Sequence, residues 1–244
     1  MRIRANDEIR PVSMTPDFIG SADGSVLVEF GNTRVICTAM AEEKTPPFLA
    51  ETGRGWVSAE YAMLPASTLT RKQRDRKGQD GRGVEIQRLV GRSLRSVVDM
   101  GRLGERTIWL DCDVIQADGG TRAASITGAF VALVLAVDKL MGQGVLHESP
   151  IRDYVAAISC GVVDEELLLD LCYEEDSKAQ VDANFVMSGS GGIIEIQGTG
   201  EKRPMTLAEL DELIRLATIG TSRLFALQKQ AMGERAARIG RGVF

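Results

Sequence analysis

Apolar residues recur every three or four positions in three parts of the chain, which is the spacing of one face of a helix. In residues 84–100 this stripe predicts a helix with Gly101 as its C-cap. Residues 122–141 are apolar on nearly every side, which predicts a helix buried at the centre of the molecule. A third helix is predicted for residues 207–234, because Thr206 and Glu209 form a capping-box pattern at its start. Its inner face is expected to carry Leu207, Leu210, Leu213, Ile214 and Leu216.

Alternation of apolar and polar residues predicts strands elsewhere. Residues 25–40 are expected to form a hairpin, with Gly31 and Asn32 supplying the positive φ angles of its turn. Residues 107–116 predict a strand before the central helix, and residues 154–163, 167–173, 184–187 and 193–197 predict strands after it. Residues 45–65 are expected to be irregular, and the polar, basic residues 69–82 are expected to form a mobile loop.

This order of elements predicts an α+β fold, in which a mixed sheet packs with helices. A composition of 44% hydrophobic and 26% charged residues is typical of a globular protein and excludes a disordered or fibrous one. The chain contains no internal repeat and no linker-like segment. We therefore expect residues 1–244 to form a single domain.

The charges are unevenly distributed along the chain. The net charge is −5, yet residues 71–102 hold ten basic residues against four acidic ones. Residues 164–182 hold eight acidic residues and one lysine. A basic strip can bind a polyanion while an acidic remainder keeps the protein soluble, but both segments can equally be solvated faces. Composition alone leaves these two interpretations open.

The cysteines, the histidine and the apolar runs exclude several classes of protein. Cys37, Cys112, Cys160 and Cys172 lie far apart in apolar surroundings, which predicts reduced core thiols rather than a disulfide framework or a zinc site. His147 is the only histidine and is expected in a surface loop, which argues against a Ser-His-Asp triad. The longest apolar stretch contains Asp138 and Lys139, and the start of the chain does not resemble a signal peptide. We expect a cytoplasmic protein with no membrane partner.

The turn before the central helix has the chemistry of a phosphate site. It reads Asp118-Gly119-Gly120-Thr121-Arg122. Unpaired N–H groups at a helix start attract anions, two glycines allow close approach, and an arginine can bind two anion oxygens. The plainer interpretation is a glycine-rich turn with a helix cap, although Arg122 favours the anion site. Arg82 would supply a second guanidinium if the two helix starts converge; otherwise it is an exposed arginine.

Paired carboxylates provide a second candidate group. Asp176 and Asp182 are expected to follow a strand and to be separated by a short polar turn. Such a pair can hold Mg²⁺ or Mn²⁺, or one member can act as a general acid, although solvated surface is the plainer interpretation for each residue alone. Asp170 lies within an apolar run and is expected to be a buried structural carboxylate. Phosphoryl transfer requires positioning and charge more than a nucleophilic side chain, so bound phosphate could itself be the nucleophile.

Six runs of residues resemble the ribonuclease PH family, and the likeness extends from about residue 8 to residue 229. They are GWVSAEYAMLP at 55–65, GR at 81–82 with EIQRLVGR at 85–92, LDCDVIQADGGTR at 110–122, SITGA at 125–129, YEEDS at 173–177 and EIQGTGE at 195–201. The resemblance implies the α+β fold of the second domain of ribosomal protein S5. It also implies a phosphate-dependent 3′-to-5′ exoribonuclease that trims tRNA precursors and other RNA 3′ ends, releases nucleoside diphosphates, and runs in reverse as a nucleotidyltransferase.

The resemblance also implies roles for particular residues. Arg82, Gly120, Thr121 and Arg122 would bind inorganic phosphate, the co-substrate. Asp176 and Asp182 would hold Mg²⁺ or Mn²⁺ or protonate the leaving 3′-oxygen, which with Arg82 and Arg122 makes four catalytic residues. The basic loop would grip the RNA through Arg71, Arg74, Arg76 and Lys77. The expected assembly is a homohexamer, a trimer of dimers, that binds RNA and not DNA.

The chain departs from the family pattern at several positions. The chain begins MRIRANDEIRPV where the family usually has an Asp-Gly-Arg element, so the role of this segment is open. Gly83, Ala123 and the run QVDAN also differ from the common family residues.

Two other functions are alternatives. A catalytically silent RNA-binding ring subunit would typically lack the phosphate arginine or the aspartate pair, which are present here. A small-molecule kinase on the same fold would require a glycine-rich ATP loop, which we do not find.

Overall fold

The computed structural model describes residues 2–74 and 81–240 of the chain. Nine strands form two sheets in this part of the chain, one with the order β1-β2-β3-β5-β4 and one with the order β7-β6-β8-β9. The strands are β1 (Val12–Pro16), β2 (Gly24–Phe30), β3 (Thr33–Glu42), β4 (Trp56–Met63), β5 (Thr107–Gln116), β6 (Val155–Val163), β7 (Glu166–Leu169), β8 (Val181–Ser188) and β9 (Ile193–Gly200). The helices are η1 (Pro47–Leu49), α1 (Gly81–Arg95), α2 (Met100–Leu103), α3 (Thr121–Gly142), α4 (Tyr173–Asp176), α5 (Leu207–Met232) and η2 (Gly233–Arg238).

The five-stranded sheet contains the predicted hairpin and two edge strands, β1 and β4, that the sequence pattern misses. β2 and β3 pair antiparallel around Gly31, whose φ is 55°, whereas Asn32 is not among the residues with positive φ. The prediction that residues 45–65 are irregular is wrong for β4, which pairs parallel with β5. β4 is an edge strand, so only Val57 and Tyr61 along it are buried and its apolar alternation is weak.

The first predicted helix is shorter at its end than its apolar stripe. α1 ends at Arg95, and Val98 instead forms an isolated bridge with Ile151. Gly101 is not a C-cap, because it lies inside α2, where its N–H donates to the Asp99 side chain. The stripe persists beyond the helix because Val97, in a turn, and Val98, in this bridge, are buried in the same core.

The central helix is confirmed with almost its predicted bounds. α3 is buried along nearly its whole length, and it packs against β2, β3 and β6. In the described part of the chain it alone is long and apolar enough to span a membrane, with a mean hydropathy of 1.7 over 18 residues. Because 83% of that window is buried inside the protein, α3 is the core helix of this fold.

The second half of the chain departs from prediction where α4 begins. The strand expected at 167–173 ends at Leu169, because Asp170 has a φ of 57° and Tyr173 opens α4. α5 has the predicted capping box, in which Thr206 accepts from the N–H of Glu209. Leu207, the first residue of α5, is 82% exposed, so its predicted place on the inner face of the helix is wrong.

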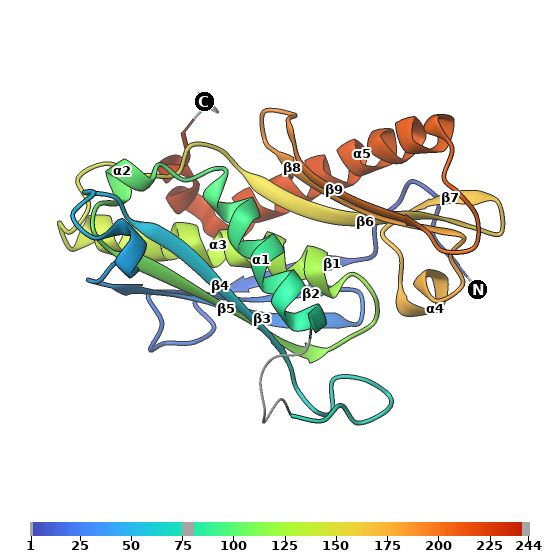
Figure 1. The fold of residues 1–244 in the computed structure, drawn as a ribbon, viewed down its shortest axis with the longest axis horizontal. Helices are drawn as coiled ribbons and strands as arrows, with labels where there is room; N and C mark the ends of the chain where they lie inside the picture. Colours follow the sequence, from blue (N-terminus) through green and yellow to red (C-terminus); the bar gives the residue numbers. More distant parts are fainter. Residues whose placement is uncertain (1, 75–80, 241–244) are drawn as a thin grey trace.

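The two sheets share one apolar core. Figure 1 shows α3 between the five-stranded sheet and the layer that contains β6 and α5, with the N-terminus beside α4. Phe30 of the first sheet and Phe185 of the second belong to the same cluster of buried residues. Cys37, Cys112 and Cys160 are buried free thiols and Cys172 is half-buried, and His147 is exposed in a loop. The fold is α+β, as the sequence predicts.

Candidate active site

The glycine turn between β5 and α3 packs directly against the start of α4. Gly119 and Gly120 have φ angles of 75° and 66°, which disfavour any side chain. A Cβ atom on Gly119 would lie 2.6 Å from the backbone of Leu171 and Cys172, so only glycine allows this approach. The Asp118 side chain accepts a hydrogen bond from the N–H of Tyr173 at 3.2 Å. These contacts bring the start of α3 beside the helix that ends at Asp176.

The start of α3 presents the groups that an anion site needs. Gly120 is the N-cap and supplies no side-chain cap, so the first N–H groups of the helix have no intrahelical acceptor. The Thr121 hydroxyl lies 2.9 Å from the hydroxyl of Tyr61 on β4, which fixes its position. Burial raises the pKa of Tyr61, so this phenol stays neutral and able to share a hydrogen bond.

The sequence raises the possibility that Arg82 and Arg122 converge, and the packing of their two helices allows this. α1 and α3 pack against each other, and each carries its arginine in its first turn. Both positive charges act on the carboxyls of Asp176 and Asp182, where they lower the pKa. Arg122 is half-buried and Arg82 exposed. Two guanidinium groups from separate helices therefore act electrostatically on one pair of carboxylates.

Asp176 and Asp182 come from different elements than the sequence suggests. Asp176 is the last residue of α4, and Asp182 is the second residue of β8. Burial and the charge of Asp176 together raise the pKa of Asp182 to about 6, although the charge of Arg122 opposes this effect. Burial also raises the pKa of Asp176, although its side chain is exposed at the rim, and Arg122 and Arg82 oppose it. The charge of Asp176 thus disfavours ionisation of Asp182, which a bound proton or cation would relieve.

The residues present fit a divalent cation held in part by the protein. The charge of Glu201 raises the pKa of both aspartates, so a third carboxylate adds negative charge near the pair. Among the residues that the structure describes, no group of three or more His, Cys, Asp or Glu side chains is gathered at metal-binding distance. Two carboxylates with water and phosphate oxygens are a usual Mg²⁺ environment.

A buried ion pair beneath the turn is the main element that sequence reasoning misses. Arg10 and Asp170 are 5% and 1% exposed, and Arg10 Nη2 lies 2.7 Å from Asp170 Oδ1. The Nη1 group of Arg10 donates to the carbonyl of Asp118 at 2.6 Å. The prediction of a buried structural carboxylate at Asp170 is confirmed. A buried carboxylate requires a cationic partner, but nothing in the sequence identifies that partner as Arg10.

The N-terminal segment, whose role the sequence leaves open, is held against α4. The guanidinium groups of Arg2 and Arg4 donate to the Glu175 carboxylate at 3.0 and 2.9 Å. Glu175 also accepts from the N–H of Cys172 at 3.0 Å, which closes the first turn of α4. The segment therefore stabilises the helix that carries Asp176.

The predicted RNA-binding loop is described only in part. Arg71 and Arg74 are exposed, outside any helix or strand, just before the gap in the described residues. Arg76 and Lys77 lie outside the described residues. The mobility expected for this loop and the RNA contacts of its four basic residues stay predictions.

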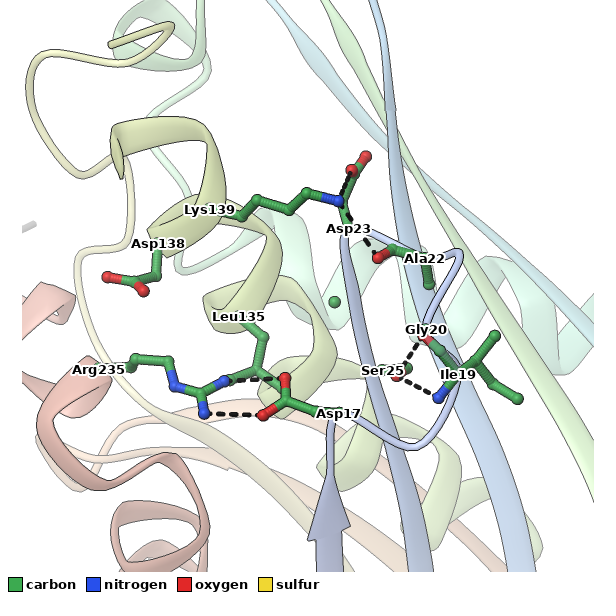
Figure 2. A pocket seen from close by; sticks show the side chains of 11 residues that line it. Asp17, Ile19, Gly20, Ala22, Asp23, Ser25, Leu135, Asp138, Lys139 and Arg235 are labelled. Atoms are coloured by element: carbon green, nitrogen blue, oxygen red, sulfur yellow. Dashed lines mark hydrogen bonds and ion pairs between the residues drawn. The ribbon is translucent and has the colours of Figure 1, made fainter. Parts of the chain in front are cut away.

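A separate hollow of about 250 Å³ lies at the opposite end of α3 (Figure 2). The 22-residue helix rises about 1.5 Å per residue, so roughly 33 Å separate its two ends. Within the hollow, Asp17 makes two hydrogen bonds with Arg235, and Asp23 pairs with Lys139 at 2.8 Å (Figure 2). These pairs join the turn after β1 to η2 and to the end of α3, which is a structural role.

Known protein families and relatives match this chain over nearly its whole length. The model of the 3′ exoribonuclease family, domain 1, matches residues 8–137, and that of domain 2 matches residues 153–220. The chain is 58% identical over 232 residues to Ribonuclease PH of Syntrophomonas wolfei, covering 94% of this chain and 97% of that protein. It is 54% identical over 246 residues to Ribonuclease PH of Moorella thermoacetica, covering 98% of each.

Solved structures share the fold at lower identity. Rice Rrp46 superposes with a TM-score of 0.76 and 19% identity, covering 94% of this chain and 98% of that one. A chain of the Archaeoglobus fulgidus exosome with RNA bound to the active site superposes with a TM-score of 0.78 and 23% identity, covering 92% and 91%. At these identities the likeness concerns the fold alone.

Proposed function

The chain belongs to the 3′ exoribonuclease family, and we propose that it acts as a ribonuclease PH. It uses inorganic phosphate to remove nucleotides from the 3′ ends of tRNA precursors and other RNAs, and it transfers nucleotides to RNA 3′ ends in the reverse reaction. The observation that carries this proposal is that α1 and α3 pack against each other, and that Arg82 and Arg122 in their first turns both act electrostatically on Asp176 and Asp182.

The reaction is a phosphoryl transfer in which phosphate is the nucleophile. An oxygen of inorganic phosphate attacks the phosphorus of the last phosphodiester bond, and the bond from that phosphorus to the 3′-oxygen of the preceding nucleotide breaks. The products are a nucleoside 5′-diphosphate and an RNA one nucleotide shorter with a free 3′-hydroxyl. Arg82, Arg122, Thr121 and the N–H groups at Gly120 and beyond would hold the attacking phosphate.

The aspartate pair has two tasks in this proposal. Its carboxylate oxygens would hold Mg²⁺ or Mn²⁺, which when bound supplies positive charge to neutralise the phosphate oxygens. A protonated carboxyl of the pair would donate its proton to the leaving 3′-oxygen. The burial and mutual repulsion that raise the pKa of Asp182 favour retention of such a proton near neutral pH.

The substrate and the assembly complete the proposal. The exposed side chains of Arg71 and Arg74, together with the neighbouring Arg76 and Lys77, would contact the RNA backbone electrostatically.

On the face of the first sheet turned away from α3, the paired residues Met40 and Trp109 are 50% and 37% exposed. Exposed apolar side chains on an open sheet face suit a contact between copies of the chain, as in a cytoplasmic homohexamer built as a trimer of dimers.

The experiment supplies a 3′-extended tRNA with Mg²⁺, with and without inorganic phosphate, and identifies the released nucleotide. Asp176→Asn and Asp182→Asn should each reduce the rate at least about 100-fold, the scale of a lost acid or charge-stabilising group. The matched control is Glu174→Gln, which removes an exposed carboxylate from the same helix and should keep the rate. Release of nucleoside monophosphates without phosphate would overturn the proposal.

A further inference from the structure

Arg122 is held in place by a neutral side chain. Its Nη1 group donates to Oε1 of Gln197 on β9 at 2.9 Å. Gln197 is half-buried and stands opposite Asn184 of β8, two positions along from Asp182. This hydrogen bond uses one of the five N–H donors of the guanidinium and leaves the others for an anion.

A second residue determines which way the Gln197 amide points. The Nε2 group of Gln197 donates to Glu195 Oε1 at 3.3 Å. The same Glu195 oxygen lies 2.7 Å from Nη2 of Arg92 on α1, which anchors the carboxylate. Because a carboxylate only accepts hydrogen bonds, Glu195 selects the amide orientation that turns the Gln197 oxygen toward Arg122.

The neutrality of Gln197 matters for an arginine that binds phosphate. A carboxylate at the same distance would neutralise Arg122 and compete with the incoming anion. The ion-pair partner that the structure does offer, Glu85, lies 3.7 Å from Arg122 Nη1 and is 53% exposed, so its hold is weak. Gln197 therefore fixes the direction of Arg122 without reducing its charge.

We propose that Gln197 is the positioning residue for the phosphate-binding arginine, and that Glu195 acts through Gln197 by orienting its amide. The proposal rests on the proposed function, since it assigns the role of an acceptor within that same site. It predicts that changes at these two positions weaken the use of phosphate and spare the binding of RNA.

The test measures KM for inorganic phosphate, KM for RNA, and kcat, together with the rise in melting temperature that phosphate causes. Gln197→Met removes the acceptor at similar length and should raise KM for phosphate about three- to tenfold. Gln197→Glu should raise it further, because phosphate must then displace a carboxylate. In both variants KM for RNA, and kcat at saturating phosphate, should stay within about twofold of the wild type.

Two further variants separate positioning from general disturbance. Glu195→Gln should also raise KM for phosphate, and the double variant Glu195→Gln/Gln197→Met should be no worse than Gln197→Met alone, since both act through one contact. The control is Gln143→Glu, an exposed amide at the opposite end of α3, which should keep all three constants.

Each outcome has a definite meaning. An unchanged KM for phosphate in Gln197→Glu, or an equal rise in both KM values with a lower melting temperature, would overturn the inference. If the wild type released no nucleoside diphosphate, the proposed function would fail instead. The inference would then stand or fall on whether Gln197→Glu abolishes the rise in melting temperature that phosphate produces.

Discussion

At the residue scale, the site depends on a buried charge pair beneath the glycine turn. Arg10 binds both Asp170 oxygens and the carbonyl of Asp118, so it joins the segment before β1, the segment before α4 and the turn before α3. A buried ion pair often adds little net stability, because both charges lose their hydration. Removing one partner alone, however, leaves an uncompensated buried charge.

Replacement of Arg10 should therefore be costly in a way that a second change relieves. Arg10→Met should lower the free energy of unfolding by about 3–5 kcal/mol, because the Asp170 charge loses its partner inside the protein. Urea unfolding measures this loss. The double variant Arg10→Met/Asp170→Asn should recover part of it, since asparagine is neutral and tolerates the φ of 57° at this position. A loss of under about 1 kcal/mol in the single variant, as for a surface pair, would contradict the argument.

The same residues mark how far sequence can predict a site. Arg122 could be predicted because the two glycines and the helix start beside it form a local pattern typical of an anion site. Asp176 and Asp182 could be found as acids but not as neighbours of Arg122, because the contact between Asp118 and Tyr173 that brings them together spans 55 positions. Arg10 and Asp170 are 160 positions apart, and no local pattern encodes such a pairing.

At the element scale, periodicity predicts the elements that bury one continuous face. β5 has its predicted bounds, and α3 differs from prediction by one residue at each end. The edge strands β1 and β4 are missed, because each pairs with one neighbour only and alternation is diluted by polar residues. α4 is missed because four residues are too few for a helical period to appear.

The capping box of α5 gives an element-scale prediction on pH. Glu209 accepts from the N–H of Thr206 at 2.8 Å and pairs with Arg203 at 2.6 Å. The Arg203 hydrogen bond is the largest cause that lowers the pKa of Glu209 from 4.5 to about 2. A lowered pKa means that the ionised form stabilises the fold above pH 4.5, and that this contribution is lost as the pH falls through about 2.

Glu209→Gln should therefore lower the melting temperature at pH 7, and the difference from the wild type should shrink below about pH 4.5 and vanish near pH 2. Thermal unfolding followed by circular dichroism over this pH range measures the difference. Asp211→Asn, which removes an exposed carboxylate from the same helix, is the control. A difference that stays constant with pH would show that the cap acts through packing alone.

At the scale of the whole molecule, the two sheets and α3 form one core, and the first sheet keeps an open face. Our proposal of a hexamer places this face, with Met40 and Trp109, in a contact between copies. Trp109→Glu should disrupt that contact, because a charge buried in an apolar interface loses its hydration. Light scattering after gel filtration should show smaller particles than the wild type. Leu207→Glu, at an exposed position on α5, should leave the particle mass unchanged.

The fate of the attacking inorganic phosphate tests the central claim most directly. Wild-type protein is incubated with a 3′-extended tRNA, Mg²⁺ and isotopically labelled inorganic phosphate, and the released nucleotides are analysed by mass. We predict that the label appears in the β-phosphate of nucleoside diphosphates, and that Arg122→Ala reduces its incorporation about tenfold or more at limiting phosphate. Unlabelled nucleoside monophosphates as the product would mean that water is the nucleophile, and would contradict the account.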